Sequence, residues 1–266
     1  MKRRLFVKSS LATGALAGIT PMVSKGLGYN APKKSALEFY ELRTYTLKNE
    51  AQQKLIEDYF KNAAIPALNK LGSKNIGVFT EQQPEGQTKM FVIIPYTSIE
   101  TFATINDKLA ANSDYLKAAD AYLNAPASEP AYERIQSSLL KAFAGMPQLQ
   151  APGNQPRMFE LRRYESASEA AGKKKIQMFN EVGEIAIFKK VGLTPVFFGE
   201  SIIGEMRPNL TYMLTFNNME EHDKRWKAFG GDPEWNRIKA LPGYEDAKIV
   251  SHITRTFLVP ASCSQI

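Results

Sequence analysis

The chain has 266 residues, of which 44% are hydrophobic and 23% charged, an ordinary composition for a globular protein of one large domain or two small ones. The formal net charge of +7 does not indicate nucleic-acid binding, because Lys2, Arg3, Arg4, Lys8 and Lys25 precede every acidic residue. Without these five, 29 of the 34 basic residues remain against 27 acidic ones, so the rest of the chain is nearly neutral.

The first predicted element is a leader, residues 1–31. Its segment KRRLFVK (Lys2–Lys8) resembles a twin-arginine export signal, and the Ala-, Gly- and Leu-rich stretch Ser9–Ile19 matches the weakly hydrophobic core of such a signal. A membrane helix is the alternative, but Lys8 interrupts the apolar run and leaves it too short to span a bilayer. The sequence therefore predicts a periplasmic protein, exported by the twin-arginine route, with no stable membrane insertion after signal cleavage.

Two similar units follow the leader. Glu41 and Glu160 lie 119 residues apart in matching segments, and the pair Gly72 and Gly192 lies 120 apart. A repeat of this length is too long for a solenoid and indicates duplicated domains. We expect a first domain at 36–145, a Pro-, Gln- and Gly-rich linker at 146–156, and a second domain at 157–262.

Each unit shows the order strand, helix, strand, strand, helix, strand. In the first unit we expect strands at Leu37–Leu47, Ile76–Glu81, Lys89–Tyr96 and Arg134–Phe143, and helical segments at Ala51–Leu71, after Ser98, and at Tyr115–Leu123. In the second we expect strands at Arg157–Tyr164, Thr194–Ser201, Leu210–Phe216 and Lys248–Leu258, and helices at Lys173–Val191, Met219–Phe229 and Asp232–Leu241. This order predicts an α+β protein of two tandem ferredoxin-like domains, each an antiparallel sheet with helices on one face.

The opening strands carry a recognisable motif. YELRTYTL (Tyr40–Leu47) and FELRRYE (Phe159–Glu165) resemble the first strand of NIPSNAP domains, and DPEWNRI (Asp232–Ile238) is similar to the Trp-containing helix of that family. The first unit departs from the family there, with Tyr115 and no Trp after Asp114. The resemblance implies a dimeric α/β-barrel architecture, in which the two halves of this chain pack their sheets face to face. The family has no defined reaction, so the resemblance does not imply one.

Alternate residues of the two opening strands form a candidate polar set. Side chains on a strand alternate between its faces, so one face carries Glu41, Arg43 and Tyr45 in the first unit and Glu160, Arg162 and Tyr164 in the second. We expect this face to point away from the helices, into the barrel. Two hypotheses follow: a ligand pocket in which Arg holds an anionic oxygen while Glu or Tyr moves a proton, or internal ion pairs that fix the strands. Persistence in both copies favours the structural hypothesis, and no catalytic residue is assigned.

Other chemistry-bearing residues are few. His252 in the last strand is the one candidate haem ligand, although a lone strand histidine is more often a core residue, and His222 is expected to be solvated. No metal site is predicted, and Cys263 in the polar tail is a poor candidate nucleophile. The charge run GKKKIQ (Gly172–Gln177) predicts a solvated helix start, and Trp226 and Trp235 predict helix–sheet packing.

These features favour an exported protein that binds a small molecule or has an accessory role, needs no cofactor, and is able to form a homo-oligomer. The alternative is a barrel enzyme, either a cofactor-free oxygenase or isomerase, or a haem protein through His252.

Overall fold

The structure is a computed structural model that describes residues 36–84, 86–153, 155 and 157–266. The described residues form one compact unit. The predicted leader, residues 1–31, lies outside the described residues. No helix in the described part combines the length and apolar character needed to cross a membrane.

Each half of the chain contributes four strands and a set of helices. In the first half the strands are β1 (Phe39–Thr46), β2 (Gly77–Glu81), β3 (Lys89–Tyr96) and β4 (Arg134–Ala142). Its helices are α1 (Glu50–Tyr59), the π-helical turn η1 (Phe60–Ala64), α2 (Ile65–Lys70), α3 (Ile99–Ala110), α4 (Ser113–Ala118) and α5 (Asp120–Leu123).

The second half repeats this order. Its strands are β5 (Met158–Glu165), β6 (Thr194–Ile203), β7 (Asn209–Phe216) and β8 (His252–Pro260). Its helices are α6 (Glu169–Gln177), the π-helical turn η2 (Met178–Val182), α7 (Glu184–Lys190), α8 (Met219–Gly231), α9 (Pro233–Ile238) and α10 (Asp246–Ile249). The segment Lys248–Leu258, predicted as one strand, begins within α10 and is extended only from His252.

Local sequence explains where the helices begin and end. Asn49, Ser98 and Asn218 are N-cap residues whose side-chain oxygens accept the backbone N–H of Gln52, Thr101 and Glu221 respectively. Gly72 and Gly192 follow the second helical segment of each half with positive φ, +98° and +82°, which a residue with a side chain rarely adopts.

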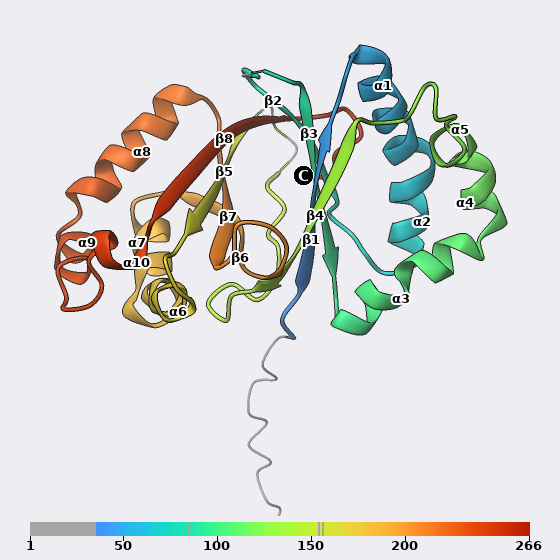
Figure 1. Ribbon diagram of the computed structural model, residues 1–266. Helices are drawn as coiled ribbons and strands as arrows, with labels where there is room; N and C mark the ends of the chain where they lie inside the picture. Colours follow the sequence, from blue (N-terminus) through green and yellow to red (C-terminus); the bar gives the residue numbers. More distant parts are fainter. Residues whose placement is uncertain (1–35, 85, 154, 156) are drawn as a thin grey trace, which may run out of the picture. The chain divides into compact units, whose positions relative to one another are not determined.

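The eight strands close into a single barrel in the order β1-β3-β2-β8-β5-β7-β6-β4, and every neighbouring pair is antiparallel. The predicted α+β class with an antiparallel sheet is confirmed. The expectation of two separate sheets is replaced by one continuous sheet, because β2 pairs with β8 and β4 pairs with β6 across the two halves. Helices α1–α5 cover one side of the barrel and α6–α10 the opposite side (Figure 1).

The predicted direction of the strand faces was wrong. The barrel interior is apolar, and it receives Tyr40, Phe159 and Leu161, which we had expected under the helices. Tyr45 and Tyr164 instead pack in the clusters between the sheet and the helices. A narrow eight-stranded barrel must be filled by side chains, and apolar residues fill it without leaving buried charges inside. The interior cluster comprises Tyr40, Phe79, Phe91, Ile93, Leu140, Ala142, Leu149, Phe159, Leu161, Val196, Phe197, Met213, Leu258 and Ile266.

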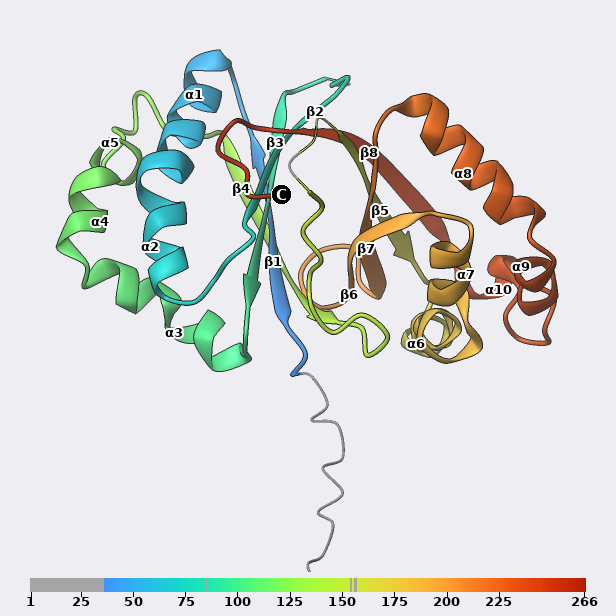
Figure 2. The ribbon, with the colours of Figure 1, turned by 180° about the vertical axis from the view of Figure 1, so that it is seen from behind.

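One end of the barrel is plugged. Leu149, from the segment predicted as a linker, is buried in the interior cluster, and its N–H donates to Glu38 Oε2 at 2.8 Å beside the start of β1. Ile266 enters the same cluster at the other side of that end, where Gln265 exchanges hydrogen bonds with the backbone of Ile76. Figure 2 shows the C-terminal residue against the barrel strands. The opposite end, where β1, β2, β5 and β6 finish, is therefore the end that can admit a ligand.

Candidate functional site

In the first half, the predicted polar set forms a closed network under the helices. The Arg43 guanidinium donates to both Glu41 oxygens, at 2.7 and 2.9 Å. The hydroxyls of Tyr96 and Ser137 donate to the same carboxylate at 2.9 and 2.7 Å. Tyr45 lies beyond this cluster, within a group of aromatic rings.

The electrostatics of Glu41 follow from these partners. Burial alone would raise the pKa of the Glu41 carboxyl, but Arg43, Ser137 and Tyr96 together hold that pKa below its usual value. Burial likewise opposes the charge on Arg43, yet Glu41 keeps its pKa well above the usual range. Both groups are therefore charged and satisfied by each other, an arrangement that supports a structural role.

In the second half, the same Glu and Arg have different partners. Glu160 is fully buried, and its Oε1 accepts from Arg162 Nη1 at 2.5 Å. Trp226 Nε1 donates to Glu160 Oε2 at 2.8 Å, and the Arg162 guanidinium lies 4.5 Å from the Trp226 ring centroid. Arg162 also donates to the Tyr164 hydroxyl at 3.1 Å.

His222 belongs to this second network, so its predicted solvated position was wrong. The residue lies on the inner face of α8, 6% exposed, with its ring against Phe216 and Phe257. Its Nε2 lies 3.3 Å from Glu160 Oε2, but that approach lacks hydrogen-bond geometry. His222 and Phe229, seven residues apart, are the buried residues of α8, and this helical spacing is the signal that places His222 inward.

A buried ion pair that the sequence did not reveal lies beside this network. Lys175, predicted to be solvated, is 0% exposed, and its Nζ contacts Glu184 Oε2 at 3.1 Å and Asp246 Oδ1 at 3.2 Å. Burial raises the pKa of Glu184 to about 7 against the opposing effect of Lys175. The corresponding positions of the first half are the buried, apolar residues Ile56 and Ala64.

The open end of the barrel holds a cavity of about 310 Å³, which we call the barrel mouth. It is on the inner face of the wall, the opposite face from the two Glu–Arg networks. Apolar side chains, among them Leu42 and Leu161, lie toward the barrel core, and charged and hydroxyl groups lie nearer the opening. The lining residues are Leu42, Thr44, Glu81, Lys89, Phe91, Gln136, Leu161, Arg163, Glu205, Met206, Thr211, Thr254 and Thr256.

Arg163 and Lys89 are the cations of the barrel mouth. The Nε of Arg163 donates to Glu165 Oε1 at 3.2 Å and its Nη2 to Thr254 Oγ1 at 3.4 Å, while the Arg163 side chain stays 35% exposed. The equivalent residue in the first half, 119 positions earlier, is Thr44, which lines the same cavity. The sequence motif pointed to Arg162, whereas the difference between YELRTY and FELRRY was the signal for Arg163.

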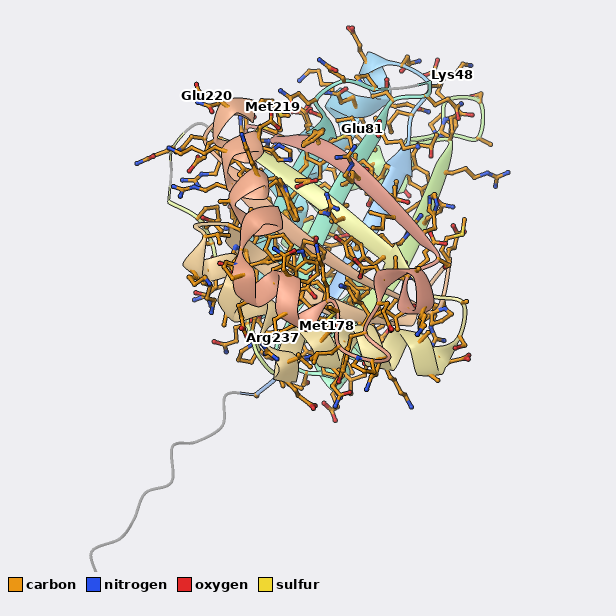
Figure 3. All side chains as sticks on the ribbon, turned by 90° about the vertical axis from the view of Figure 1, so that its left-hand side faces the viewer. Lys48, Glu81, Met178, Met219, Glu220 and Arg237 are labelled. Atoms are coloured by element: carbon orange, nitrogen blue, oxygen red, sulfur yellow. The ribbon has the colours of Figure 1, made fainter. Side chains whose placement is uncertain are left out.

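A second hollow, of about 580 Å³, lies outside the barrel wall near the start of α8. Figure 3 shows Glu81 and Met219, which line it, toward one end of the unit and away from Met178 and Arg237. It shares Glu81 and Thr256 with the barrel mouth and has Arg255 as its cation.

The residues considered for cofactors do not assemble a site. His252 is the first residue of β8, exposed, and outside the lining of the barrel mouth. Haem requires an apolar slot beside its ligand, and an exposed strand end does not fit it. Among the described residues, no group of three or more His, Cys, Asp or Glu side chains is placed to hold a metal. Cys263 is half-buried against the first helix-side core, where burial raises the pKa of its thiol.

Solved structures share this fold. A proposed monooxygenase from Fusobacterium nucleatum aligns with 85% of this chain and 93% of its own, at 10% identity and a TM-score of 0.57. A second proposed monooxygenase, from Lactobacillus acidophilus, aligns with 84% of this chain and 94% of its own, at 13% identity and a TM-score of 0.54. At such identities the likeness shows the fold alone.

Family membership rests on the sequence of both halves. An uncharacterised NIPSNAP-like domain protein from Burkholderia xenovorans aligns with 40% of this chain and 86% of its own, at 20% identity and a TM-score of 0.36. No curated protein matches the chain. The NIPSNAP family pattern matches residues 40–146 and again residues 159–265, which together span most of the sequence. The chain therefore belongs to the NIPSNAP family and carries two tandem copies of its domain.

Proposed function

We propose that this protein binds a small molecule with an anionic oxygen in the barrel mouth, and that Arg163 is its anchor. The observation that carries the proposal is the replacement of Thr44 by Arg163 at equivalent inward positions of the two halves. Arg163 is partly buried on the inner wall, above the apolar barrel interior, and its side chain donates hydrogen bonds to Glu165 and Thr254. Its pairing with Glu165 is partly exposed, which leaves the guanidinium within reach of a ligand.

The chemistry of the barrel mouth supports an oxygen anion as the recognised group. A guanidinium offers forked donors that match a carboxylate or enolate, and the hydroxyls of Thr211 and Thr254 lie on the strands that flank Arg163. Glu81 and Glu205 also line the mouth and disfavour ligands of high negative charge, which makes a singly charged anion the best match. The volume is near the lower limit for small-molecule sites.

The test is a calorimetric titration with butanoate and benzoate. We expect wild type to bind and Arg163→Thr, which copies the first half, to lose at least about tenfold in affinity, because a charged hydrogen bond is lost. Arg255→Thr is the matched control. It removes an arginine that lines the second hollow and lies on β8, the strand beside that of Arg163. Equal binding by Arg163→Thr and wild type, or loss only in Arg255→Thr, would contradict the proposal.

The second candidate function is a cofactor-free oxygenase. The full-length likeness to two proposed monooxygenases favours it over other reactions. In this alternative Arg163 would hold the phenolate of an electron-rich phenol and Glu81 or Glu205 would accept its proton. One oxygen atom of O₂ would replace a ring hydrogen to give a quinone, and the other would leave as water with that hydrogen and the accepted proton. Oxygen uptake with such phenols, abolished in Arg163→Thr, would support it, and no uptake with any phenol that binds would reject it.

Export and domain architecture are also proposals. Export to the periplasm is supported by the resemblance of residues 1–31 to a twin-arginine signal.

Each half is interpreted as a ferredoxin-like unit. The strand order within the sheet is β4-β1-β3-β2 in the first half and the equivalent β8-β5-β7-β6 in the second. A small molecule is the proposed partner, and a homo-oligomer is compatible with the fold.

A further inference from the structure

Exposed apolar side chains gather at the rim of the barrel mouth. Ile203 at the end of β6 and Met206 in the following loop are 64% and 56% exposed, more than the other large hydrophobic residues described as exposed. Since β6 ends at the open end, both lie beside the mouth. Ile135 and Ile253 are at the same end but lie opposite Tyr45 and Tyr164, and so belong to the outer face of the sheet. Grouped apolar exposure of this kind marks a binding surface.

Met206 joins this rim to the cavity. It lines the barrel mouth although more than half of its surface is exposed. Its φ is +54°, in the left-handed region that residues with side chains seldom occupy and that is often found at binding sites. A methionine is flexible and polarisable, which suits contact with hydrocarbon chains of varied shape.

The loop that carries Met206 is held in place by hydrogen bonds. The buried side-chain amide of Asn209 donates to the carbonyl oxygens of Glu205 and Met206, at 3.1 and 3.0 Å. Gln136, on β4 beside β6, donates to Glu205 Oε2 at 2.8 Å. These hydrogen bonds hold the loop in a conformation that is unfavourable for Met206 itself. They therefore keep the Met206 side chain at the mouth.

We infer that the ligand is an amphipathic anion, with its charged oxygen at Arg163 and a hydrocarbon body that passes Met206 and lies against Ile203. This inference rests on the proposed function of the barrel mouth. The cavity of about 310 Å³ holds only a small head group, and its opening leads over apolar residues. A ligand of this shape pairs each part of the surface with matching chemistry: the guanidinium with the anion, and the exposed rim with carbon that would otherwise contact water.

The experiment is a calorimetric titration with straight-chain carboxylates from butanoate to decanoate, each below its micelle concentration. We expect wild-type affinity to rise about two- to fourfold for each added methylene, as partial or full burial of that group predicts. Met206→Gly should keep its melting temperature because glycine accepts the positive φ, and should lose most of the chain-length dependence. Met219→Ala, which removes a methionine from the second hollow, is the control and should behave as wild type.

The outcomes separate the two proposals. Binding of butanoate that needs Arg163 but does not strengthen with chain length overturns the amphipathic ligand and leaves the proposed function standing. Absence of binding by every carboxylate overturns both. If Met206→Gly changes the sedimentation coefficient and leaves the chain-length dependence intact, the rim is a contact between copies of the protein, and the inference is wrong.

Discussion

The two halves of the chain place the same glutamate and arginine on the outer face of the barrel but complete the carboxylates differently. Glu41 receives hydroxyl donors from Tyr96 and Ser137, whereas Glu160 receives the indole of Trp226. The ion pair itself is common to both halves, as expected for a structural device. The copies have diverged at the Lys175–Glu184 pair and at Arg163, each of which is present in one half alone. The shared ion pairs are interpreted as structural, whereas Arg163 is the candidate functional residue.

The largest expected effect is on stability, when either shared carboxylate is removed. Glu160→Ala should lower the free energy of unfolding by about 3–5 kcal/mol, because the buried Arg162 loses its counterion. Glu41→Ala should act in the same direction, since Arg43 is equally enclosed. Urea denaturation measures both changes. The control is Glu234→Ala in the exposed pair with Arg237, which should leave the midpoint unchanged. If neither buried variant shifts the midpoint, the networks are not structural.

The next effect concerns the buried ion pair of the second half. The double variant Lys175→Ile/Glu184→Ala, which copies Ile56 and Ala64, should be neutral or stabilising by about 1–4 kcal/mol, because well-packed apolar groups replace two desolvated charges. Lys175→Ile alone should destabilise, since Glu184 is left uncompensated. Urea denaturation of the three proteins compares them, and a double variant less stable than Lys175→Ile would contradict the expectation.

The pH dependence of the same pair has a definite sign. The pKa of Glu184 is about 7 in the folded state and 4.5 as its ordinary value, so the folded state binds this proton more tightly. Its contribution to stability is present below pH 4.5 and is lost as the pH rises through about 7. Glu184→Gln should therefore remove a fall in stability across this window. Glu41, whose pKa is lowered, contributes in the opposite sense and loses its contribution as the pH falls.

Much of the fold could be predicted from the sequence, because alternation, helical spacing and the repeat are local signals. The order of strands and helices along the chain followed from them, and so did the antiparallel sheet. The direction of the faces did not, because Tyr40 and Tyr45 are both aromatic and alternation alone does not say which side is the barrel interior. Closure of one barrel depends on β2 with β8 and β4 with β6, pairings between distant segments that no local pattern reveals.

The candidate site was less accessible. The repeated Glu, Arg and Tyr drew attention to residues that are alike in the two copies, whereas the barrel mouth depends on Arg163, where they differ. Lys175 lies in a run of three lysines, and only the fold shows that this one turns inward to meet Glu184, nine residues away. Comparison of the two copies, position by position, would have found both.

The most direct test of Arg163 as the anchor moves the arginine from one half to the other. Titration with hexanoate should show at least about tenfold weaker binding by Arg163→Thr than by wild type, with little change in melting temperature because its ion pair is partly exposed. The double variant Arg163→Thr/Thr44→Arg, with the guanidinium on the opposite wall of the same cavity, should recover part of the lost affinity. Equal affinity of all three proteins would contradict the account.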